Sequence, residues 1–194
     1  LPVNGISVGL RNITRGYAWR NLDADKGKRI LIGAVHAVKI RMSKLQFGLE
    51  ACSLAVLFGM AALLLSCWPN LPEQVPAHFN AAGEIDRWGG KQELLLLPAA
   101  GVMLWLLLTA VGLFPKAWNL PVEVTEQNRK KAYRRIRTLL TTLKLEVMVL
   151  FFAIEYFSVL LLPLPAAFLP ASLAVLAVTL IAGVVSTVRA EKKK

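Results

Sequence analysis

The residues best suited to chemistry lie in a polar stretch, residues 69–93, which contains His78, Asn80, Glu84 and Asp86. Imidazole, amide and carboxylate groups at this spacing can bind a ligand or a partner, or can hydrogen-bond the stretch into its own fold. A metal site is not indicated, because protein metal sites combine Cys, His and carboxylate ligands at spacings that this stretch lacks. We therefore predict no metal and no cofactor, and the structural and recognition roles both stay open.

No catalytic constellation accompanies these residues. The sequence lacks a phosphate-cradling glycine loop, a zinc-protease helix motif and a serine elbow. An enzyme would need a second catalytic group beside His78, and the sequence identifies none, so we predict a protein that is not an enzyme. Cys52 and Cys67 lie 15 residues apart in one apolar run, which indicates packing residues rather than a redox or zinc pair.

A second candidate is Glu155, an acid deep inside an apolar run that is rich in Phe. An ionised carboxylate near the middle of a bilayer costs roughly 3 kcal/mol, so Glu155 should face other helices or be protonated. It could serve as an intramembrane proton or cation site of a transport component. The structural alternative is a neutral acid that hydrogen-bonds a neighbouring helix, through Ser66, Thr109 or Tyr156 for example.

These candidates must be positioned by membrane helices. Of the chain, 56% is apolar and only 18% is charged, which leaves too little polar surface for a soluble domain of this size. Four apolar runs are long enough to cross ~30 Å of hydrocarbon, and lipid requires such segments to be helices or a closed barrel. Because Leu and Ala dominate these runs, we predict an all-α integral membrane protein with four transmembrane helices, at about residues 48–68, 94–114, 140–162 and 168–188.

The basic residues predict the orientation of these helices. Of 23 Lys and Arg residues, 21 precede the first span, follow the second span or lie in the tail. Cytoplasmic segments are enriched in Lys and Arg, so both ends of the chain are predicted in the cytoplasm (N-in/C-in), as a multi-pass protein of the bacterial plasma (inner) membrane. A net charge of +11 would suggest nucleic acid on a soluble surface. Here the charges lie in blocks between spans, so we predict no nucleic-acid partner.

The chain begins with Leu, whereas Met42 stands almost directly before the first span. We predict that the natural protein starts at Met42 and that the upstream residues are leader sequence; the alternative is a cytoplasmic arm. The predicted organisation is a basic cytoplasmic segment, 1–44, a membrane domain, 45–188, with an external loop, 69–93, and a basic cytoplasmic loop, 115–139, and a basic tail, 189–194.

The basic loop leads into the third span as an amphipathic helix, because apolar residues recur there at three- and four-residue spacing. Its cations would lie against anionic lipid headgroups on the cytoplasmic side, each contact contributing ~1 kcal/mol. Docking of a cytoplasmic regulator is the alternative. The predicted headgroup contacts are Arg129, Lys130, Lys131, Arg134, Arg135 and Arg137.

The external loop resembles a known family. Its run of Leu71-Pro72 and Val75-Pro76-Ala77-His78-Phe79-Asn80, followed by Gly83, Asp86, Trp88, Lys91 and Pro98, is similar to the bacterial membrane family filed as domain of unknown function 1648. That pattern is roughly LP..IP.HFN..G..D.W..K......P between two spans, and the resemblance covers roughly residues 45–110. The same module resembles the N-terminal part of SdpI-type immunity proteins, whose second, C-terminal membrane portion is not recognised in this chain.

The resemblance implies a non-enzymatic binding or regulatory module. SdpI-type proteins protect a producing cell from its own secreted toxin and can relay a signal, so the loop is expected to recognise a peptide or protein partner. A transport component with Glu155 as its proton or cation site is the alternative function. The residues predicted to bind the partner or to structure the loop are Pro76, His78, Phe79, Asn80, Gly83, Asp86, Trp88 and Lys91.

Overall fold

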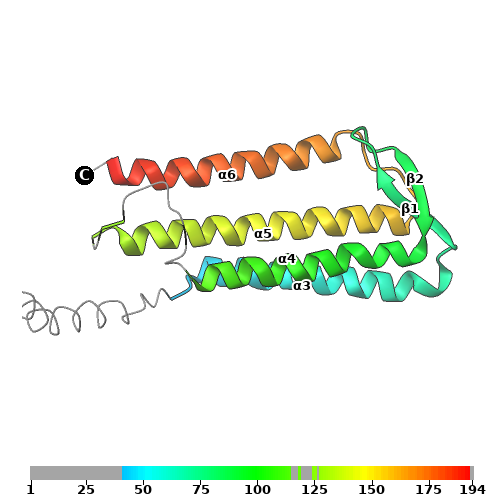
Figure 1. The fold of residues 1–194 in the computed structure, drawn as a ribbon, viewed down its shortest axis with the longest axis horizontal. Helices are drawn as coiled ribbons and strands as arrows, with labels where there is room; N and C mark the ends of the chain where they lie inside the picture. Colours follow the sequence, from blue (N-terminus) through cyan, green and yellow to red (C-terminus); the bar gives the residue numbers. More distant parts are fainter. Residues whose placement is uncertain (1–40, 115–117, 119–123, 126, 193–194) are drawn as a thin grey trace, which may run out of the picture. The chain divides into compact units, whose positions relative to one another are not determined.

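The computed structural model describes residues 41–114, 118, 124–125 and 127–192 (Figure 1). Residues 1–40 of the predicted leader, and much of the first part of the predicted loop 115–139, lie outside the described residues. The described elements, in chain order, are α3 (Lys44–Cys67), a 3₁₀ turn (Trp68–Asn70), β1 (Gln74–Phe79), β2 (Ile85–Gly90), a second 3₁₀ turn (Lys91–Leu95), α4 (Leu96–Leu113), α5 (Arg129–Val159) and α6 (Phe168–Lys192).

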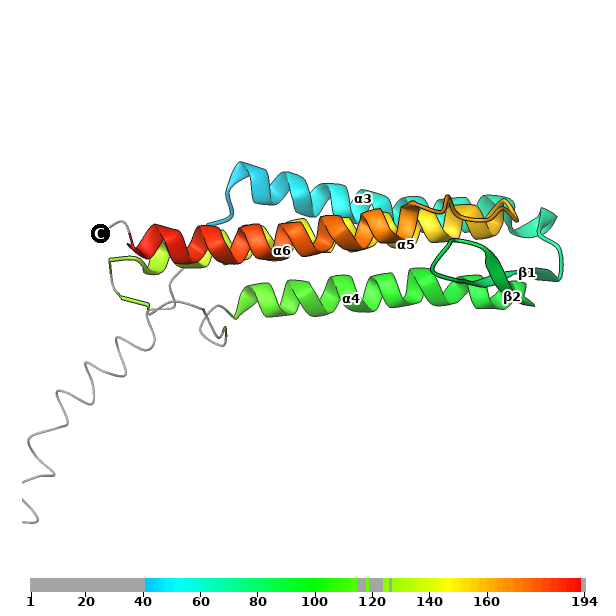
Figure 2. The same cartoon turned by 90° about the horizontal axis from the view of Figure 1, so that it is seen from above.

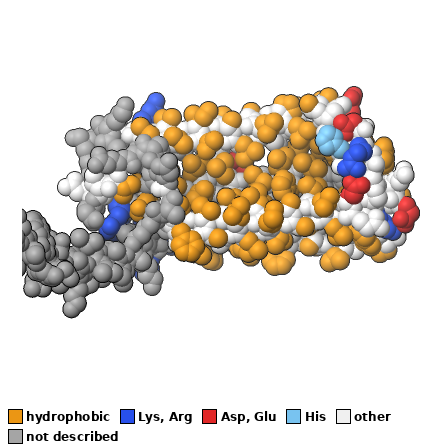
Figure 3. All heavy atoms as spheres, viewed as in Figure 1, with side chains coloured by type: hydrophobic (Ala, Val, Ile, Leu, Met, Phe, Trp, Pro, Cys, Tyr) orange, Lys and Arg blue, Asp and Glu red, His pale blue; other side chains and the backbone are white. Residues whose placement is uncertain are grey.

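Within the described residues, three helices are long and apolar enough to cross a membrane: Lys44–Asn70, Lys91–Leu113 and Phe168–Arg189. Apolar side chains cover the flanks of the helices, and charged side chains gather at the hairpin end (Figure 3). The protein is therefore a mostly helical membrane protein. α5 is not among the three, because its apolar half carries Lys144, Glu146 and Glu155.

α5 is the helix against which α3, α4 and α6 all pack (Figures 1 and 2). Polar residues on α5 can therefore face other helices instead of lipid, which explains why the least apolar helix lies in this position. α3 and α5 run in the same direction (Figure 1). Near the start of both helices, the Gln46 side chain donates to the Arg134 carbonyl. Buried residues recur at intervals of seven along the seam between them, at Gln46, Ser53 and Met60 on α3 and Thr141, Met148 and Glu155 on α5.

The start of α3 is defined by a capping box. Ser43 Oγ accepts from the Gln46 amide at 3.2 Å, and Gln46 Oε1 accepts from the Ser43 amide at 3.0 Å. Two of the amides that a helix start leaves without intrahelical partners are thereby satisfied. Pro69 follows the last turn of α3 and cannot continue it.

The prediction of an all-α fold needs one correction, because β1 and β2 form an antiparallel hairpin within the predicted external loop. Pro72 and Pro76 disfavour a helix there, and this stretch need not satisfy its backbone inside lipid. Asn80 and Gly83 form the turn: the Gly83 amide donates to the Asn80 carbonyl at 2.9 Å, and Asn80 Oδ1 accepts from the amides of Ala82 and Glu84. Gly83 has a φ of +84°, in the left-handed region that glycine adopts without steric cost.

Candidate functional site

The tip of the hairpin is docked on the connection between α5 and α6. The Leu164 amide donates to the Gly83 carbonyl at 2.8 Å. A Cβ atom on Gly83 would lie 2.4 Å from the Leu164 carbonyl oxygen, so only glycine permits this approach. The hairpin is thus held at both its base and its tip, over the ends of the helices.

His78 and Asp86 form a pair across the two strands. His78 Nδ1 lies 2.6 Å from Asp86 Oδ1, and both side chains are exposed. The strand register shifts on both sides of His78, between Pro76 and His78 and between His78 and Phe79. Such irregularities re-aim side chains and are common next to functional sites. The structure therefore brings together two of the residues that the sequence singled out.

Two ion pairs stabilise β2 and the first residue after it: Arg87 pairs with Glu93, and Lys91 pairs with Glu73. Arg87 Nη2 donates to Glu93 Oε2 at 2.8 Å and also to the Ala77 carbonyl at 3.3 Å. The hydrogen bond and the charge of Glu93 raise the pKa of Arg87, although its charge is fixed at any physiological pH. Lys91 Nζ donates to Glu73 Oε1 at 3.0 Å at the base of the hairpin. Glu93 was not among the predicted residues.

A cavity of about 360 Å³ lies between the hairpin and the helix ends. His78, Arg87 and Glu93 supply polar groups to its lining. Its apolar lining comes from the hairpin, α4, α5 and the start of α6, with Pro76, Phe79, Leu94, Leu97, Ile154, Leu164 and Leu169 among the residues. A concave apolar site with a few convergent polar groups has the usual composition of a small-molecule or side-chain binding pocket.

The other predicted residues of the loop have different positions. Asn80 and Gly83 shape the turn, and Lys91 is paired at the base. Trp88 is 50% exposed and does not line the cavity. Of the eight predicted loop residues, Pro76, His78 and Phe79 line the cavity directly.

Glu155 is 0% exposed, and neither of its carboxylate oxygens has a hydrogen-bond partner among the described residues. The hydrogen bonds suggested as its structural role are therefore not formed. Thr109 instead donates to the Trp105 carbonyl, and Ser66 donates to the Leu63 carbonyl. Glu155 lies one helical turn before Val159, which packs in the apolar cluster below the hairpin.

A second polar cluster, which the sequence did not indicate, joins α3, α4 and α5. Lys144 Nζ donates to both oxygens of Glu50, at 2.8 and 2.7 Å, and to Thr109 Oγ1 at 2.8 Å. Its ammonium also lies 4.7 Å from the ring centroid of Trp105, whose indole donates to Ser53 Oγ. In the sequence, Glu50 and Lys144 lie near the ends of two apolar runs, and this position was the only signal for the cluster.

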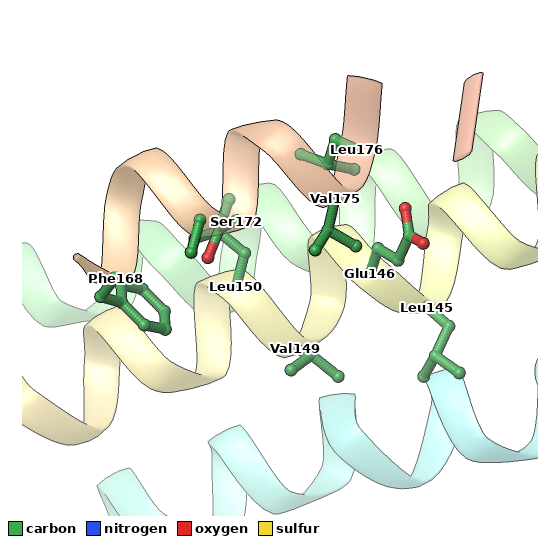
Figure 4. A pocket seen from close by; sticks show the side chains of 9 residues that line it. Leu145, Glu146, Val149, Leu150, Phe168, Ser172, Val175 and Leu176 are labelled. Atoms are coloured by element: carbon green, nitrogen blue, oxygen red, sulfur yellow. The ribbon is translucent and has the colours of Figure 1, made fainter. Parts of the chain in front are cut away.

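Between α5 and α6 lies an apolar groove of about 400 Å³ (Figure 4). Its lining includes Glu146, whose Oε1 accepts from Thr179 Oγ1 at 2.6 Å, together with Val149, Leu150, Val175 and Leu176. Further along, a Cβ atom on Gly183 would lie 2.6 Å from Leu139, so the two helices approach closely there. The groove shares no lining residue with the cavity beneath the hairpin.

The predicted headgroup contacts occupy the first turns of α5. Lys130, Lys131, Arg134 and Arg135 are exposed, and Arg129 and Arg137 are half-buried. Two of them also join helix ends: Arg135 donates to the Ser186 carbonyl at 2.6 Å, and Arg137 donates to the Gly112 carbonyl at 3.1 Å.

The fold and the site define a class: a helical membrane protein with a β-hairpin docked over the ends of its helices. The family model described as Domain of unknown function (DUF1648) matches residues 55–102, from within α3 through the hairpin to the start of α4. This match confirms the resemblance to that family which the loop motif indicated. α5 and α6, which complete the cavity, lie outside the matched residues.

A curated relative is an uncharacterized protein of Archaeoglobus fulgidus, 40% identical over 65 residues. The alignment covers 29% of this chain and 36% of the relative, so the chain spans little more than a third of the protein that it matches. No solved structure matches the chain.

Proposed function

We propose that this protein is a non-enzymatic binding or regulatory module of the bacterial plasma membrane, which recognises an extracytoplasmic peptide or protein partner through the hairpin. The cavity beneath the hairpin carries this proposal. An apolar side chain of the partner would enter the cavity, and the polar groups of His78, Arg87 and Glu93 would hydrogen-bond the partner's backbone. An immunity-like or signalling role is the form of recognition that the resemblance favours.

The proposal includes four spans with both chain ends in the cytoplasm. α5 packs along α3, α4 and α6, so a membrane that α3, α4 and α6 cross would surround α5 as well. Its charged residues Lys144 and Glu155 are buried against other helices, so they avoid the free-energy cost of exposing a charged side chain to lipid. The exposed cations at the start of α5 lie at the end opposite the hairpin, as the positive-inside rule requires.

Photocrosslinking tests the recognition. A photoreactive residue at Phe79, which lines the cavity, is expected to give a discrete adduct with one peptide or protein in intact cells. Adding Ala77→Leu, which fills the cavity, is expected to reduce that adduct at least tenfold. Ala81→Leu is the matched control, because Ala81 is exposed at the tip of the hairpin and does not line the cavity.

The adducts are identified by mass spectrometry. Crosslinks to the protein's own helices alone, in wild type and control, would make the hairpin a structural lid and would contradict the proposal. Equal loss in the Ala77 and Ala81 variants would show that the hairpin surface, and not the cavity, makes the contact.

A second candidate function is transport, with Glu155 as a proton or cation site. The observation that favours it is the complete burial of a carboxyl group that makes no hydrogen bond among the described residues. A buried polar group without a partner destabilises a fold and needs an explanation beyond packing. Glu155 also adjoins Ile154 and, one turn away, Ser158, both of which line the cavity.

The transport candidate is tested by Glu155→Gln in liposomes with an imposed proton or cation gradient. Loss of flux is expected with folding and insertion unchanged, because Gln keeps the shape of Glu and cannot exchange a proton. Glu146→Gln is the control, since Glu146 lies on α5 but hydrogen-bonds Thr179. Wild-type flux in the Glu155 variant would remove this candidate.

A further inference from the structure

The cavity beneath the hairpin has a polar group at its floor as well as at its mouth. Ser158 on α5 lines the cavity and is 2% exposed. Its hydroxyl forms no hydrogen bond among the described residues, whereas the Thr138 hydroxyl on the same helix donates to the Arg134 carbonyl. Glu155, one turn earlier, does not line the cavity, and both of its oxygens are shielded. The floor therefore presents a hydroxyl that is free to bond a ligand.

We propose that the side chain which enters this cavity is a tyrosine of the peptide or protein partner, with its ring between the apolar walls and its phenol hydrogen-bonded to Ser158. This inference rests on the proposed function and specifies the residue that the cavity recognises. The side chains of His78, Arg87 and Glu93 are exposed or half-exposed at the mouth, where they remain for the backbone of the partner.

The charges around the cavity favour an uncharged tip on the entering side chain. Arg87 pairs with Glu93 at 2.8 Å and His78 pairs with Asp86 at 2.6 Å, so the charges at the mouth have partners there. An ammonium or carboxylate at the floor would meet one neutral hydroxyl and apolar side chains, and burying a charge without a counter-charge is costly. A phenylalanine ring would fill the walls but would leave the hydroxyl of Ser158 buried without a partner.

The walls suit an aromatic body that carries one polar group. Phe79 from β1, Leu97 from α4 and Ile154 from α5 line a volume of about 360 Å³. A glutamine would bring an amide with several donors and acceptors, which one hydroxyl does not satisfy, whereas a phenol and a serine hydroxyl can each donate and accept. A tyrosine also loses little conformational entropy, and such aromatic anchors in desolvated pockets are typical binding hot spots.

The inference is tested with two soluble probes, N-acetyl-tyrosinamide and N-acetyl-phenylalaninamide, which differ by one hydroxyl. Binding to the full chain in nanodiscs is measured by saturation-transfer NMR, with protein-free nanodiscs as the blank. The wild type is expected to bind the tyrosine probe about tenfold more tightly, because only that probe satisfies the buried hydroxyl. Ser158→Ala is expected to abolish this preference and to leave the phenylalanine probe unaffected. Alanine is the better helix former, so the variant is expected to fold.

Ser66→Ala is the matched control. Ser66 lies at the hairpin end of the neighbouring helix α3, but its hydroxyl donates to the Leu63 carbonyl and it does not line the cavity. This variant should keep the wild-type preference for the tyrosine probe. The same loss in the Ser66 and Ser158 variants would overturn the inference, because the effect would then not belong to the cavity.

Three results with the wild type would also overturn the tyrosine anchor: equal affinity for the two probes, no binding of either, or tighter binding of N-acetyl-lysinamide. The last result would assign the recognition to a charge, with Glu155 as its source. The proposed function is decided separately by the crosslink from Phe79. A discrete adduct together with any of these three results would contradict the tyrosine anchor and leave partner recognition standing.

Discussion

Replacing Lys144 with Met is expected to lower the free energy of unfolding by about 3 kcal/mol, because it removes one partner of a buried ion pair. Lys144 is 1% exposed and donates to both oxygens of Glu50. Glu50 is 21% exposed, which places the loss at the lower end of the range known for such pairs. The measurement is reversible unfolding of the purified protein by SDS in mixed micelles, followed by circular dichroism.

The paired substitution Glu50→Leu with Lys144→Met is the control that separates the pair from its packing. It is expected to restore most of the lost stability, since apolar residues of similar volume often replace a buried ion pair without cost. The neighbouring polar groups keep partners, because Thr109 donates to the Trp105 carbonyl and Trp105 donates to Ser53. A double variant as unstable as Lys144→Met alone would show that the lysine acts through its aliphatic chain and not through the ion pair.

The pairing of Glu50 with Lys144 could not be predicted from the sequence. Lys144 lies near the start of the third predicted span, 140–162, where a cation suits the membrane surface. Its partner Glu50 lies 94 residues away in the chain, on a helix whose register against α5 is fixed by packing along the whole seam. A periodic pattern identifies the buried face of one helix, but it does not specify which residue of another helix lies opposite.

The same distinction between local and distant interactions applies to the loop. The positive φ of Gly83 was predictable, because a turn is determined by the few residues that form it. The strands were missed, because each has six residues and one contains a proline. The cavity could not be predicted at all, since Ile154, Leu164 and Leu169 reach it from the other half of the chain. Three membrane-capable helices were predicted reliably because continuous apolar length alone identifies them.

Replacing Gly83 with Ala is expected to release the tip of the hairpin from the connection between α5 and α6. A non-glycine residue at a positive φ costs about 1–2 kcal/mol, and the new Cβ atom would in addition lie 2.4 Å from the backbone oxygen of Leu164. The hydrogen bond from the Leu164 amide to the Gly83 carbonyl should then break. Amide hydrogen exchange at Leu164 is expected to accelerate about tenfold or more, because its local opening requires less free energy.

Gly90→Ala is the matched control within the hairpin. Gly90 has a negative φ, and a Cβ atom there would meet only the flexible end of Gln92, at 2.9 Å. Exchange at Leu164 should therefore stay at the wild-type rate. Unchanged exchange in the Gly83 variant as well would show that the tip is not docked in solution.

The Gly83 variant also distinguishes two modes of partner binding, one that requires the closed cavity and one that requires the hairpin alone. Leu164 lines the cavity, so release of the tip changes the cavity while leaving His78 and Asp86 paired within the hairpin. If the partner crosslinks to Phe79 in wild type and no longer does so in Gly83→Ala, recognition requires the closed cavity. If the crosslink persists, the partner binds the hairpin alone, and residues 55–102 carry the binding without α5 and α6.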